Sequence, residues 1–385
     1  MMFDVKTYNA ISNWGLKLFK RDPNYQVNQS DNPDAYITRS VDLHHAKFPS
    51  NLKVIGRAGV GYNNLPLEKL AQHGIVAYNT PGSNHNAVKE LVIALLIATS
   101  RHLFQAIEYT RKNVTGDVSL DPKSDAKLRG TEIKGKTLGV IGVGNVGSSV
   151  ANAAANLGMK VYAYDPYLTS DAAWKLSPQV TRVKTVDQAI RGMDYVTVHI
   201  PKNKANSDFI SADKIAELKQ GAYLFNYSRL GIVDNHAVEK ALDDHHLRFY
   251  ATDFGDPSLA KYNGNQVIVT PHIGGSTVEG EGNGAYMAAR DIKTFLNTGN
   301  VDRALNCPDL QLKFTTKSRL SILAKSDAKL LATLTDQLKG LGKLVSAKNQ
   351  FADYLLVNLK SPLSSSALDK LKQIPGVRRV RLIKR

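Results

Sequence analysis

A histidine and an arginine that follow apolar runs are the side chains of this sequence best suited to acid–base and carboxylate chemistry. His272 lies in the stretch VTPHIGGST, where a proline fixes the approach and glycines keep the space beside the imidazole open. An imidazole can move a proton near neutral pH. Arg229 lies in NYSRLGIVD, and its planar guanidinium can hold a carboxylate through two parallel hydrogen bonds. A structural histidine and a surface arginine at a strand end are the alternatives.

Two carboxylates in the stretch TDFGDP are candidate partners for the imidazole. A carboxylate on one imidazole nitrogen fixes the tautomer and raises the basicity of the ring. Either Asp253 or Asp256 could make this pair with His272. The string Asp253-Phe254-Gly255 also matches a kinase signature, but no HRD-type loop precedes it, and we treat that match as chance.

The glycine-rich stretch TLGVIGVGNVG predicts a dinucleotide-binding turn. An apolar run over residues 138–141 leads into Gly142, Gly144 and Gly147, an alanine-rich helical segment follows, and a second apolar run stops at Asp165. Strand, glycine turn, helix, strand and acid is the order that a dinucleotide needs, since the glycines allow the turn, the approach of the pyrophosphate and close helix packing. Asp165 would accept the ribose hydroxyls and repel a 2′-phosphate, which favours NAD over NADP. An ordinary glycine turn is the alternative.

A second glycine-rich turn, GRAGVG at residues 56–61, can bind an anion through exposed backbone N–H groups. Arg57 adds a cation that can fork onto a carboxylate or phosphate. The alternative is a tight turn with a surface arginine. For metals, the only clusters of ligand type are His44-His45 and the run from Asp243 to His246; neither has matching ligands elsewhere, and we expect no metal site.

The elements that must position these groups alternate between short apolar runs and helix-like stretches. Expected strands over residues 35–38, 53–55, 75–78, 195–200, 222–226, 249–253 and 267–270 alternate with helices over 87–101, 213–218, 237–244 and 285–296. Repeated βα units predict parallel sheets covered by helices, with ligands at the carboxyl ends of the strands. Asp165, Arg229, Asp253 and His272 all fall at or just beyond such ends. Residues 111–130 are polar and predict a crossing loop.

The last fifth of the chain differs in pattern and in charge. From residue 317 the order of expected elements is βαββαβ, which is that of a ferredoxin-like module of about 70 residues. From Leu312 onward there are 16 lysine and arginine residues against four aspartates, so this segment carries most of the net charge of +16. No nucleic-acid motif accompanies the charge, and we expect a solvated basic face; an anionic partner is the alternative.

Composition places the chain among ordinary globular proteins. Of its 385 residues, 43% are hydrophobic and 22% charged, and the single cysteine excludes an intrachain disulfide, which fits a reducing compartment. The longest apolar run, residues 91–98, is too short to span a bilayer, and the first residues lack the pattern of a signal peptide. We therefore expect a cytoplasmic protein without a membrane partner.

Together these motifs resemble the D-isomer-specific 2-hydroxyacid dehydrogenases over residues 1 to about 310. The matching segments are residues 56–61, 79–82, 142–147, 165, 199–201, 226–234, 253 and 270–277. The resemblance implies a Rossmann-type doubly wound NAD-binding domain over residues 101–285, inserted in a flavodoxin-like substrate-binding domain over residues 1–100 and 286–311. Residues 312–385 look like an ACT domain. It also implies NAD as the cofactor, a small anionic 2-hydroxy acid as the substrate, and a homodimer or homotetramer.

The resemblance implies roles for individual residues. His272 would be the acid–base group at the C2 hydroxyl, with Asp256 beside it, and Arg229 would bind the substrate carboxylate. The cofactor would be held by Gly142, Gly144, Asn145, Val146, Gly147, Asp165, Tyr227, Ser228, Asp253, Gly274 and Gly275. Substrate would be met by Arg57, Gly59 and Val60.

Two departures from the family pattern bear on function. The family usually has Glu-Pro where this chain has Asp256-Pro257, with a loop two residues shorter, so the reach of the acid toward His272 depends on the loop. We predict that Asp256 still pairs with His272. ACT domains that bind amino acids often begin with His-x-Asn-x-Pro-Gly, whereas residues 324–329 read AKSDAK. We therefore expect a mainly structural or dimerising module and no feedback by L-serine.

Overall fold

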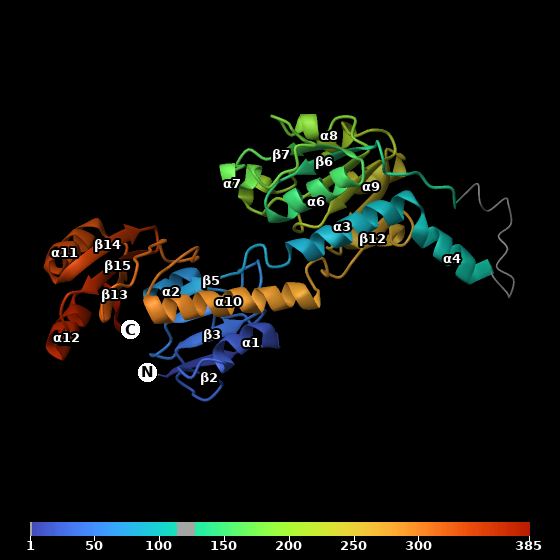
Figure 1. Ribbon diagram of the computed structural model, residues 1–385. Coiled ribbons are helices and arrows are strands. Elements are labelled where there is room, and N and C mark those ends of the chain that lie inside the picture. Colours follow the sequence, from blue (N-terminus) through green and yellow to red (C-terminus); the bar gives the residue numbers. More distant parts are fainter. Residues whose placement is uncertain (1, 114–127) are drawn as a thin grey trace. The chain divides into compact units, whose positions relative to one another are not determined.

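The computed structural model describes residues 2–113 and 128–385 and divides into two compact units. Unit 1 comprises residues 1–84 and 278–385, and unit 2 comprises residues 85–277 (Figure 1). The changes of unit therefore lie at 84/85 and 277/278, whereas the sequence led us to expect them at 100/101 and 285/286. The predicted loop over residues 111–130 lies mostly outside the described residues.

Unit 1 contains a five-stranded parallel sheet in the order β2-β1-β3-β4-β5. This is the flavodoxin-like strand order that the resemblance implied. The strands are β1 (Phe3–Thr7), β2 (Tyr25–Val27), β3 (Ala35–Thr38), β4 (Val54–Arg57) and β5 (Val76–Tyr78), and the helices are α1 (Asn13–Lys20), α2 (Leu67–Gln72) and α10 (Val278–Thr298). The sequence analysis did not predict β1, β2 or α1.

Helix α10 begins seven residues earlier than expected, because its glycines serve packing and not a loop. A Cβ on Gly282 would lie 2.3 Å from the ring of Trp14, and a Cβ on Gly15 of α1 would lie 2.3 Å from the carbonyl oxygen of Ala285. The backbones of α1 and α10 therefore approach closely, and this tertiary contact offsets the low helix propensity of glycine. Beside them, Gly56 of β4 would carry a Cβ 2.8 Å from Ile292.

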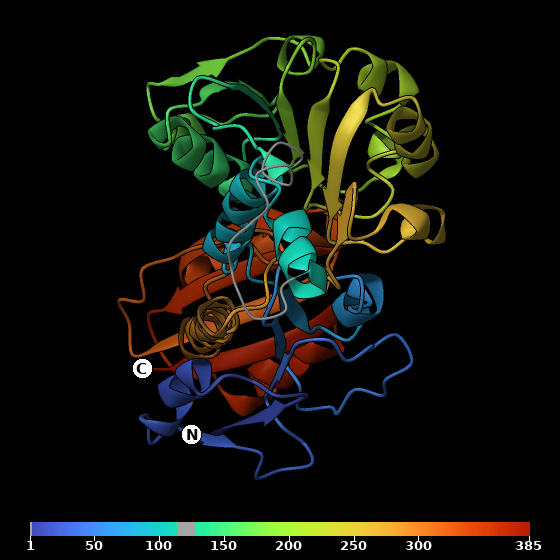
Figure 2. The ribbon, with the colours of Figure 1, turned by 90° about the vertical axis from the view of Figure 1, so that its right-hand side faces the viewer.

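Unit 2 contains a seven-stranded parallel sheet in the order β12-β11-β10-β9-β6-β7-β8 (Figure 2). Counted from β6, this is the Rossmann order 3-2-1-4-5-6 with one further strand. The strands are β6 (Thr137–Ile141), β7 (Lys160–Tyr164), β8 (Val180–Arg182), β9 (Tyr195–Val198), β10 (Ala222–Asn226), β11 (Leu247–Thr252) and β12 (Val267–Val269). Its helical segments are α3 (His85–Ser100), α4 (Leu103–Asn113), α6 (Asn145–Asn156), α7 (Ser170–Ala173), η1 (Asp187–Ala189), η2 (Lys204–Asn206), α8 (Ala212–Ala216), α9 (Asn235–Asp243) and η3 (Pro257–Tyr262).

Helix α3 packs with the Rossmann sheet, which explains why the unit boundary precedes it. Val92 and Leu96 on this helix are buried in one cluster with Val140 of β6 and Val150 of α6. Within the described residues, no single helix is long and apolar enough to cross a bilayer; α3 and α4 reach that mark only as a pair, and they are bent by 61° relative to each other.

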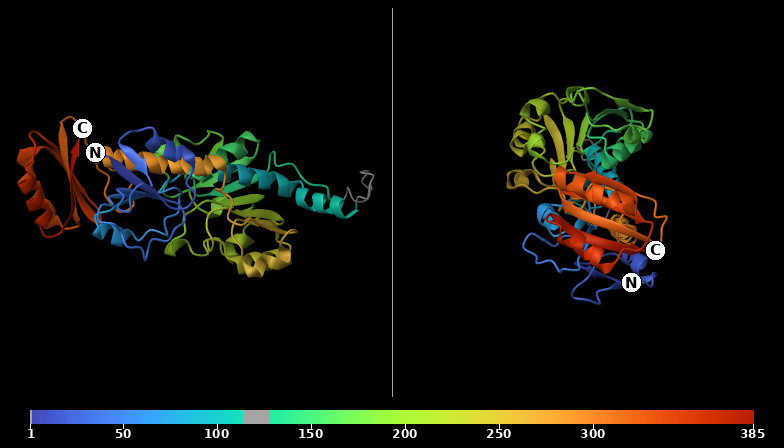
Figure 3. Two further views of the ribbon diagram at one scale, coloured as in Figure 1. Left: turned by 90° about the horizontal axis from the view of Figure 1, so that it is seen from below. Right: turned by 90° about the vertical axis from the view of Figure 1, so that its left-hand side faces the viewer.

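The C-terminal segment of unit 1 has the predicted βαββαβ order and an antiparallel sheet in the order β14-β15-β13-β16. Its elements are β13 (Ser318–Lys325), α11 (Ala328–Leu338), η4 (Lys339–Leu341), β14 (Gly342–Lys348), β15 (Ala352–Leu359), α12 (Ser365–Gln373) and β16 (Val377–Lys384). Figure 3 shows α11 and α12 on the face of this sheet that is turned away from α10. We call residues 318–384 the C-terminal module.

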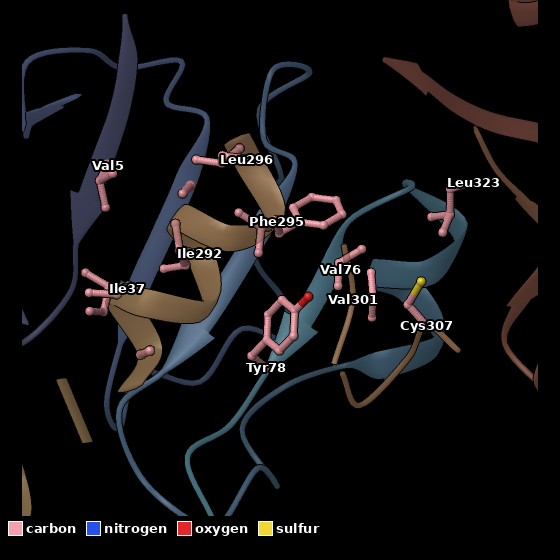
Figure 4. Packing of buried hydrophobic residues seen from close by; sticks show 14 of the residues in the cluster. Val5, Ile37, Val76, Tyr78, Ile292, Phe295, Leu296, Val301, Cys307 and Leu323 are labelled. Atoms are coloured by element: carbon pink, nitrogen blue, oxygen red, sulfur yellow. The ribbon is translucent and has the colours of Figure 1, made fainter. Parts of the chain in front are cut away.

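The other face of this sheet shares a core with the parallel sheet of unit 1. Leu323, Tyr354 and Leu356 are buried in one cluster with Tyr78 and Phe295, part of which is drawn in Figure 4. The Tyr354 hydroxyl donates to the carbonyl oxygen of Gly299 at 2.6 Å. The C-terminal module is therefore packed into unit 1 through a continuous apolar core.

Buried arginines add polar contacts to this interface. Arg381 donates to the carbonyl oxygens of Phe295 and Leu296, at 3.1 and 2.6 Å, and Arg319 donates to that of Thr298 at 2.7 Å. These carbonyls belong to the last turn of α10, where helix carbonyls run out of intrahelical donors; that of Phe295 also accepts the N–H of Gly299 at 2.8 Å. Arg379 donates to the carbonyl oxygen of Gly74, just beyond α2, at 2.7 Å. Part of the basic charge of this segment is therefore buried, and it caps helix ends.

Candidate active site

The glycine turn after β6 has the geometry that a dinucleotide requires. Gly142 has a φ of +88°, and a Cβ there would lie 2.7 Å from the carbonyl oxygen of His199. A Cβ on Gly147 would lie 1.9 Å from the carbonyl oxygen of Gly142, so the first turn of α6 sits directly on the loop. No side chain caps α6, and the space beside the α-carbon of Gly144 is open among the described residues. The N-terminus of α6, with Asn145 and Val146, can therefore receive a pyrophosphate.

Asp165 follows β7 and faces the glycine turn. Its carboxylate accepts the N–H of Val143 at 2.8 Å and the N–H of Tyr167 at 2.9 Å. Each carboxylate oxygen has more than one acceptor site, so both can still receive a ribose hydroxyl. The residue expected from the sequence spacing is thus held next to the turn in an arrangement that suits an adenosine ribose.

His199 follows β9 beneath the same turn, and the sequence analysis did not select it as a site residue. Its N–H donates to the carbonyl oxygen of Ile141 at 2.7 Å, and its Nε2 lies 2.9 Å from the hydroxyl oxygen of Thr197. Burial lowers the pKa of His199 from 6.5 to about 3. This imidazole is therefore neutral at physiological pH and supports the turn without a charge.

Arg229 lies beyond β10 in a loop with internal hydrogen bonds. The Asn226 side chain donates to the carbonyl oxygen of Arg229 at 3.0 Å and accepts the N–H of Ser228 at 3.2 Å. The Arg229 guanidinium donates to the carbonyl oxygen of Ser228 at 2.8 Å, and the Ser228 hydroxyl donates to that of Ile200, at 2.7 Å. The loop fixes the backbone under Arg229, whose side chain is half-buried.

His272 lies beyond β12, with an exposed side chain and a left-handed backbone of φ +55°. Its ring meets the ring of Phe254 edge to face, with centroids 5.2 Å apart. Asp253, at the end of β11, accepts the N–H groups of Ile273 and Gly274 at 2.9 and 2.7 Å and the hydroxyl of Thr270 at 2.5 Å. The carboxylate of Asp253 is thus directed at the loop that carries His272.

The expected pair of Asp256 with His272 is not formed, and we correct that prediction. The Asp256 carboxylate accepts the Asn235 side-chain amide at 2.8 Å and both the N–H and the hydroxyl of Ser258, at 2.9 and 2.8 Å. These are the side-chain hydrogen bonds of Asp256, and between the two described residues Asp256 and His272 there is none. The amide of Asn235 lowers the pKa of Asp256. Asp256 caps η3, because donors two residues and 21 residues away in sequence satisfy its charge.

The second glycine-rich turn lies in unit 1, beyond β4. The Arg57 guanidinium folds back over Gly59, where a Cβ would lie 2.1 Å from Nη1. The carbonyl oxygen of Gly59 accepts the N–H of Thr80 at 3.0 Å, and that of Val60 accepts the side-chain amide of Asn79 at 2.6 Å. The loops beyond β4 and β5 therefore brace each other.

Arg39 is a cation at the same edge of this sheet that the sequence analysis missed. It follows β3 and pairs with Glu281 of α10 at 2.7 Å. An arginine just beyond a predicted strand, as with Arg229, was the signal that could have identified it. The described residues contain no group of three His, Cys, Asp or Glu side chains arranged for a metal ion.

Within unit 2, the structure brings the predicted residues to one edge of the sheet. Strands β6, β7, β9, β10, β11 and β12 are parallel, so their carboxyl ends share that edge. Gly142, Asp165, His199, Asn226, Asp253 and Thr270 each follow or end one of these strands. This is the edge at which open parallel sheets bind ligands.

Comparisons with known proteins agree with this geometry. Residues 93–274 match the family model "D-isomer specific 2-hydroxyacid dehydrogenase, NAD binding domain". The chain is 34% identical to a D-3-phosphoglycerate dehydrogenase of Synechocystis over 317 residues, which are 80% of this chain and 54% of that protein. It is 32% identical to the enzyme of that name from Bacillus subtilis over 330 residues, 80% of this chain and 59% of that protein. The chain thus spans little more than half the length of these relatives.

A solved structure of NAD-bound 3-phosphoglycerate dehydrogenase from Entamoeba histolytica is similar with a TM-score of 0.63 and 26% identity, covering 80% of this chain and all of that one. An NAD-complexed D-isomer-specific 2-hydroxyacid dehydrogenase from Lactobacillus delbrueckii shares the fold, with a TM-score of 0.65 and 21% identity over 79% of this chain and all of that one. The Rossmann sheet, its glycine turn and these similarities agree, and residues 93–274 belong to the NAD-binding domain family of the D-isomer-specific 2-hydroxyacid dehydrogenases.

Proposed function

We propose that this protein oxidises 3-phosphoglycerate to 3-phosphohydroxypyruvate with NAD, which is the first step of serine biosynthesis. The observation that carries the chemistry is the shared edge of unit 2, where the glycine turn, Asp165, Arg229 and His272 occur together. The choice of substrate is supported by the names of the curated relatives at 31–34% identity.

In this proposal the chain's own residues bind, orient and move a proton. The amides at the start of α6 hold the pyrophosphate, and Asp165 holds the ribose. Arg229 binds the substrate carboxylate through its guanidinium, and residues 57–60 of unit 1 also meet the substrate. His272 takes the proton of the C2 hydroxyl through its imidazole. When bound, NAD supplies the hydride acceptor.

The decisive experiment is NADH production, followed at alkaline pH over a panel of D-2-hydroxy acids that includes 3-phosphoglycerate. We expect 3-phosphoglycerate to give the highest kcat/KM. His272→Asn should lower kcat by about 10² or more, since general acid–base catalysis contributes that much. Arg229→Gln should raise KM for the acid. Turnover of other acids but not of 3-phosphoglycerate would refute the substrate assignment.

A second substrate class, a small 2-hydroxy acid without a phosphate, is favoured by one observation. Arg39, a cation at the same edge of the unit 1 sheet as Arg57, is engaged by Glu281. If this ion pair persists when substrate binds, Arg39 is not available to bind the phosphate group of 3-phosphoglycerate. The same panel decides between the two classes, because a non-phosphorylated acid would then have the highest kcat/KM.

We further propose that the C-terminal module is an ACT-like domain with a structural role. Its shared core with Tyr78 and Phe295, and the arginines that cap α10 and α2, support this role. Added L-serine should leave the activity unchanged, and inhibition at micromolar serine would contradict the proposal. A homodimer or homotetramer stays a prediction, which light scattering after gel filtration tests.

A further inference from the structure

The loop that carries His272 adopts a backbone that few residues other than glycine adopt. His272 has a φ of +55°, in the left-handed region. Such a conformation persists where the surrounding structure imposes it, and it often occurs at functional sites. The contacts that impose this left-handed conformation therefore help to orient the imidazole of His272.

Asp253 supplies these contacts to three consecutive backbone N–H groups. Its carboxylate oxygens accept the N–H groups of Ile273 and Gly274 at 2.9 and 2.7 Å. The N–H of His272 is shared between the carbonyl oxygens of Asp253, at 3.1 Å, and Thr270, at 2.9 Å. Only 4% of Asp253 is exposed, so solvent competes little for these hydrogen bonds. A Cβ on Gly274 would lie 2.8 Å from Asp253 Oδ2, which shows how closely the loop is drawn in.

Asp253 is itself oriented by two hydroxyl groups in series. The Thr270 hydroxyl donates to Asp253 Oδ1 at 2.5 Å, so its single proton is used there. The Tyr227 hydroxyl lies 3.2 Å from the same Thr270 oxygen and must be the donor in that bond. Burial raises the pKa of Tyr227, so the phenol keeps its proton at any pH of assay. The bonds therefore run from Tyr227 to Thr270 to Asp253 and on to the His272 loop.

We propose that Tyr227 and Thr270 are positioning residues that act through Asp253 to hold His272 in its left-handed conformation. The role in turnover rests on the proposed function, which assigns proton transfer to His272. It differs from the role that the resemblance implies, in which Tyr227 and Asp253 hold the cofactor. The two roles separate in experiment, because positioning acts on kcat and cofactor lining acts on NAD affinity.

The test compares Thr270→Val, which keeps the shape and removes the hydroxyl, with Thr270→Ser, which keeps the hydroxyl. Tyr227→Phe removes the first donor. Tyr195→Phe is the matched control, because it removes a buried tyrosine hydroxyl, 2.7 Å from Ser100, at the first residue of β9. Three quantities are measured for each full-length variant: kcat, the Kd for NAD, and hydrogen–deuterium exchange of peptides over residues 270–277.

We expect Thr270→Val and Tyr227→Phe to lower kcat about tenfold, since a misplaced acid–base group loses part of its catalytic contribution. The Kd for NAD should stay within about twofold, and the amides of residues 272–274 should exchange faster as their acceptor loosens. Thr270→Ser and Tyr195→Phe should behave like the wild type in all three measurements.

Two results overturn the proposal. If the Kd for NAD rises while hydrogen exchange is unchanged, Tyr227 and Thr270 are cofactor contacts. If hydrogen exchange and kcat are both unchanged, the hydroxyl groups of Tyr227 and Thr270 do not hold the His272 loop in place. The exchange measurement needs no substrate. A wild type that turns over no acid in the panel would therefore refute the proposed function, while faster exchange in the variants would still support the tether.

Discussion

His199 makes the stability of unit 2 depend on pH in a way that one substitution isolates. The residue is half-buried beneath the glycine turn with its Nδ1 enclosed, and this burial lowers its pKa from 6.5 to about 3. Between these two values the unfolded chain binds a proton that the folded chain does not. The free energy of unfolding therefore rises with pH through this window and becomes level above it.

The size of this effect follows from the shift. One pKa unit corresponds to about 1.4 kcal/mol, so the full shift of about 3.5 units amounts to about 5 kcal/mol, reached below pH 3. At pH 5, which is about 1.5 units below the unfolded pKa, the loss relative to pH 8 is about 2 kcal/mol.

The assay is urea unfolding at pH 8 and pH 5 for the wild type and for His199→Asn, which cannot titrate. We expect the drop in unfolding free energy from pH 8 to pH 5 to be about 2 kcal/mol smaller in the variant. Hydrogen exchange over β6 and β9 locates the effect. His245→Asn is the control, because the His245 side chain is exposed in the same unit, and its replacement should leave the drop unchanged. Equal drops in the wild type and His199→Asn would refute the reasoning.

Three further predictions concern the site and the C-terminal module. Asp256→Asn should leave kcat within about threefold, because the carboxylate does not pair with His272, and a loss comparable to that of His272→Asn would restore the catalytic pair. Asp165→Asn should raise the KM for NAD about tenfold. It should also narrow the preference for NAD over NADP, since it removes the charge that repels a 2′-phosphate. Unchanged KM values for both cofactors would contradict this prediction. Arg319→Met should lower the unfolding free energy by about 4 kcal/mol, because it leaves the buried oxygens of Leu312, Thr298 and Asn358 without their donor. A loss below about 1 kcal/mol in urea unfolding would show that the arginine does not bind the module to α10.

Much of the parallel-sheet architecture could be predicted because buried parallel strands are short apolar runs. The strands Ala35–Thr38 and Ala222–Asn226 have the bounds that the sequence predicts. The βαββαβ order of the C-terminal module was also predicted and is observed. The strand Tyr25–Val27 was missed, because three residues are too few to show a periodicity, and the helix Asn13–Lys20 carries a glycine that reads as a break.

The sequence by itself determined the local chemistry: a glycine turn followed by a helix and an acid at the right spacing, and an imidazole and a guanidinium beyond strand ends. Only the tertiary structure decided which partners each charged group takes. Asp256 accepts hydrogen bonds from Asn235 and Ser258, and Asp253 accepts them from the His272 loop. The arginines of the last strand cap helices that are distant in sequence. A carboxylate or guanidinium binds whichever donors or acceptors the fold brings nearest, and that choice depends on contacts between segments that no local pattern encodes.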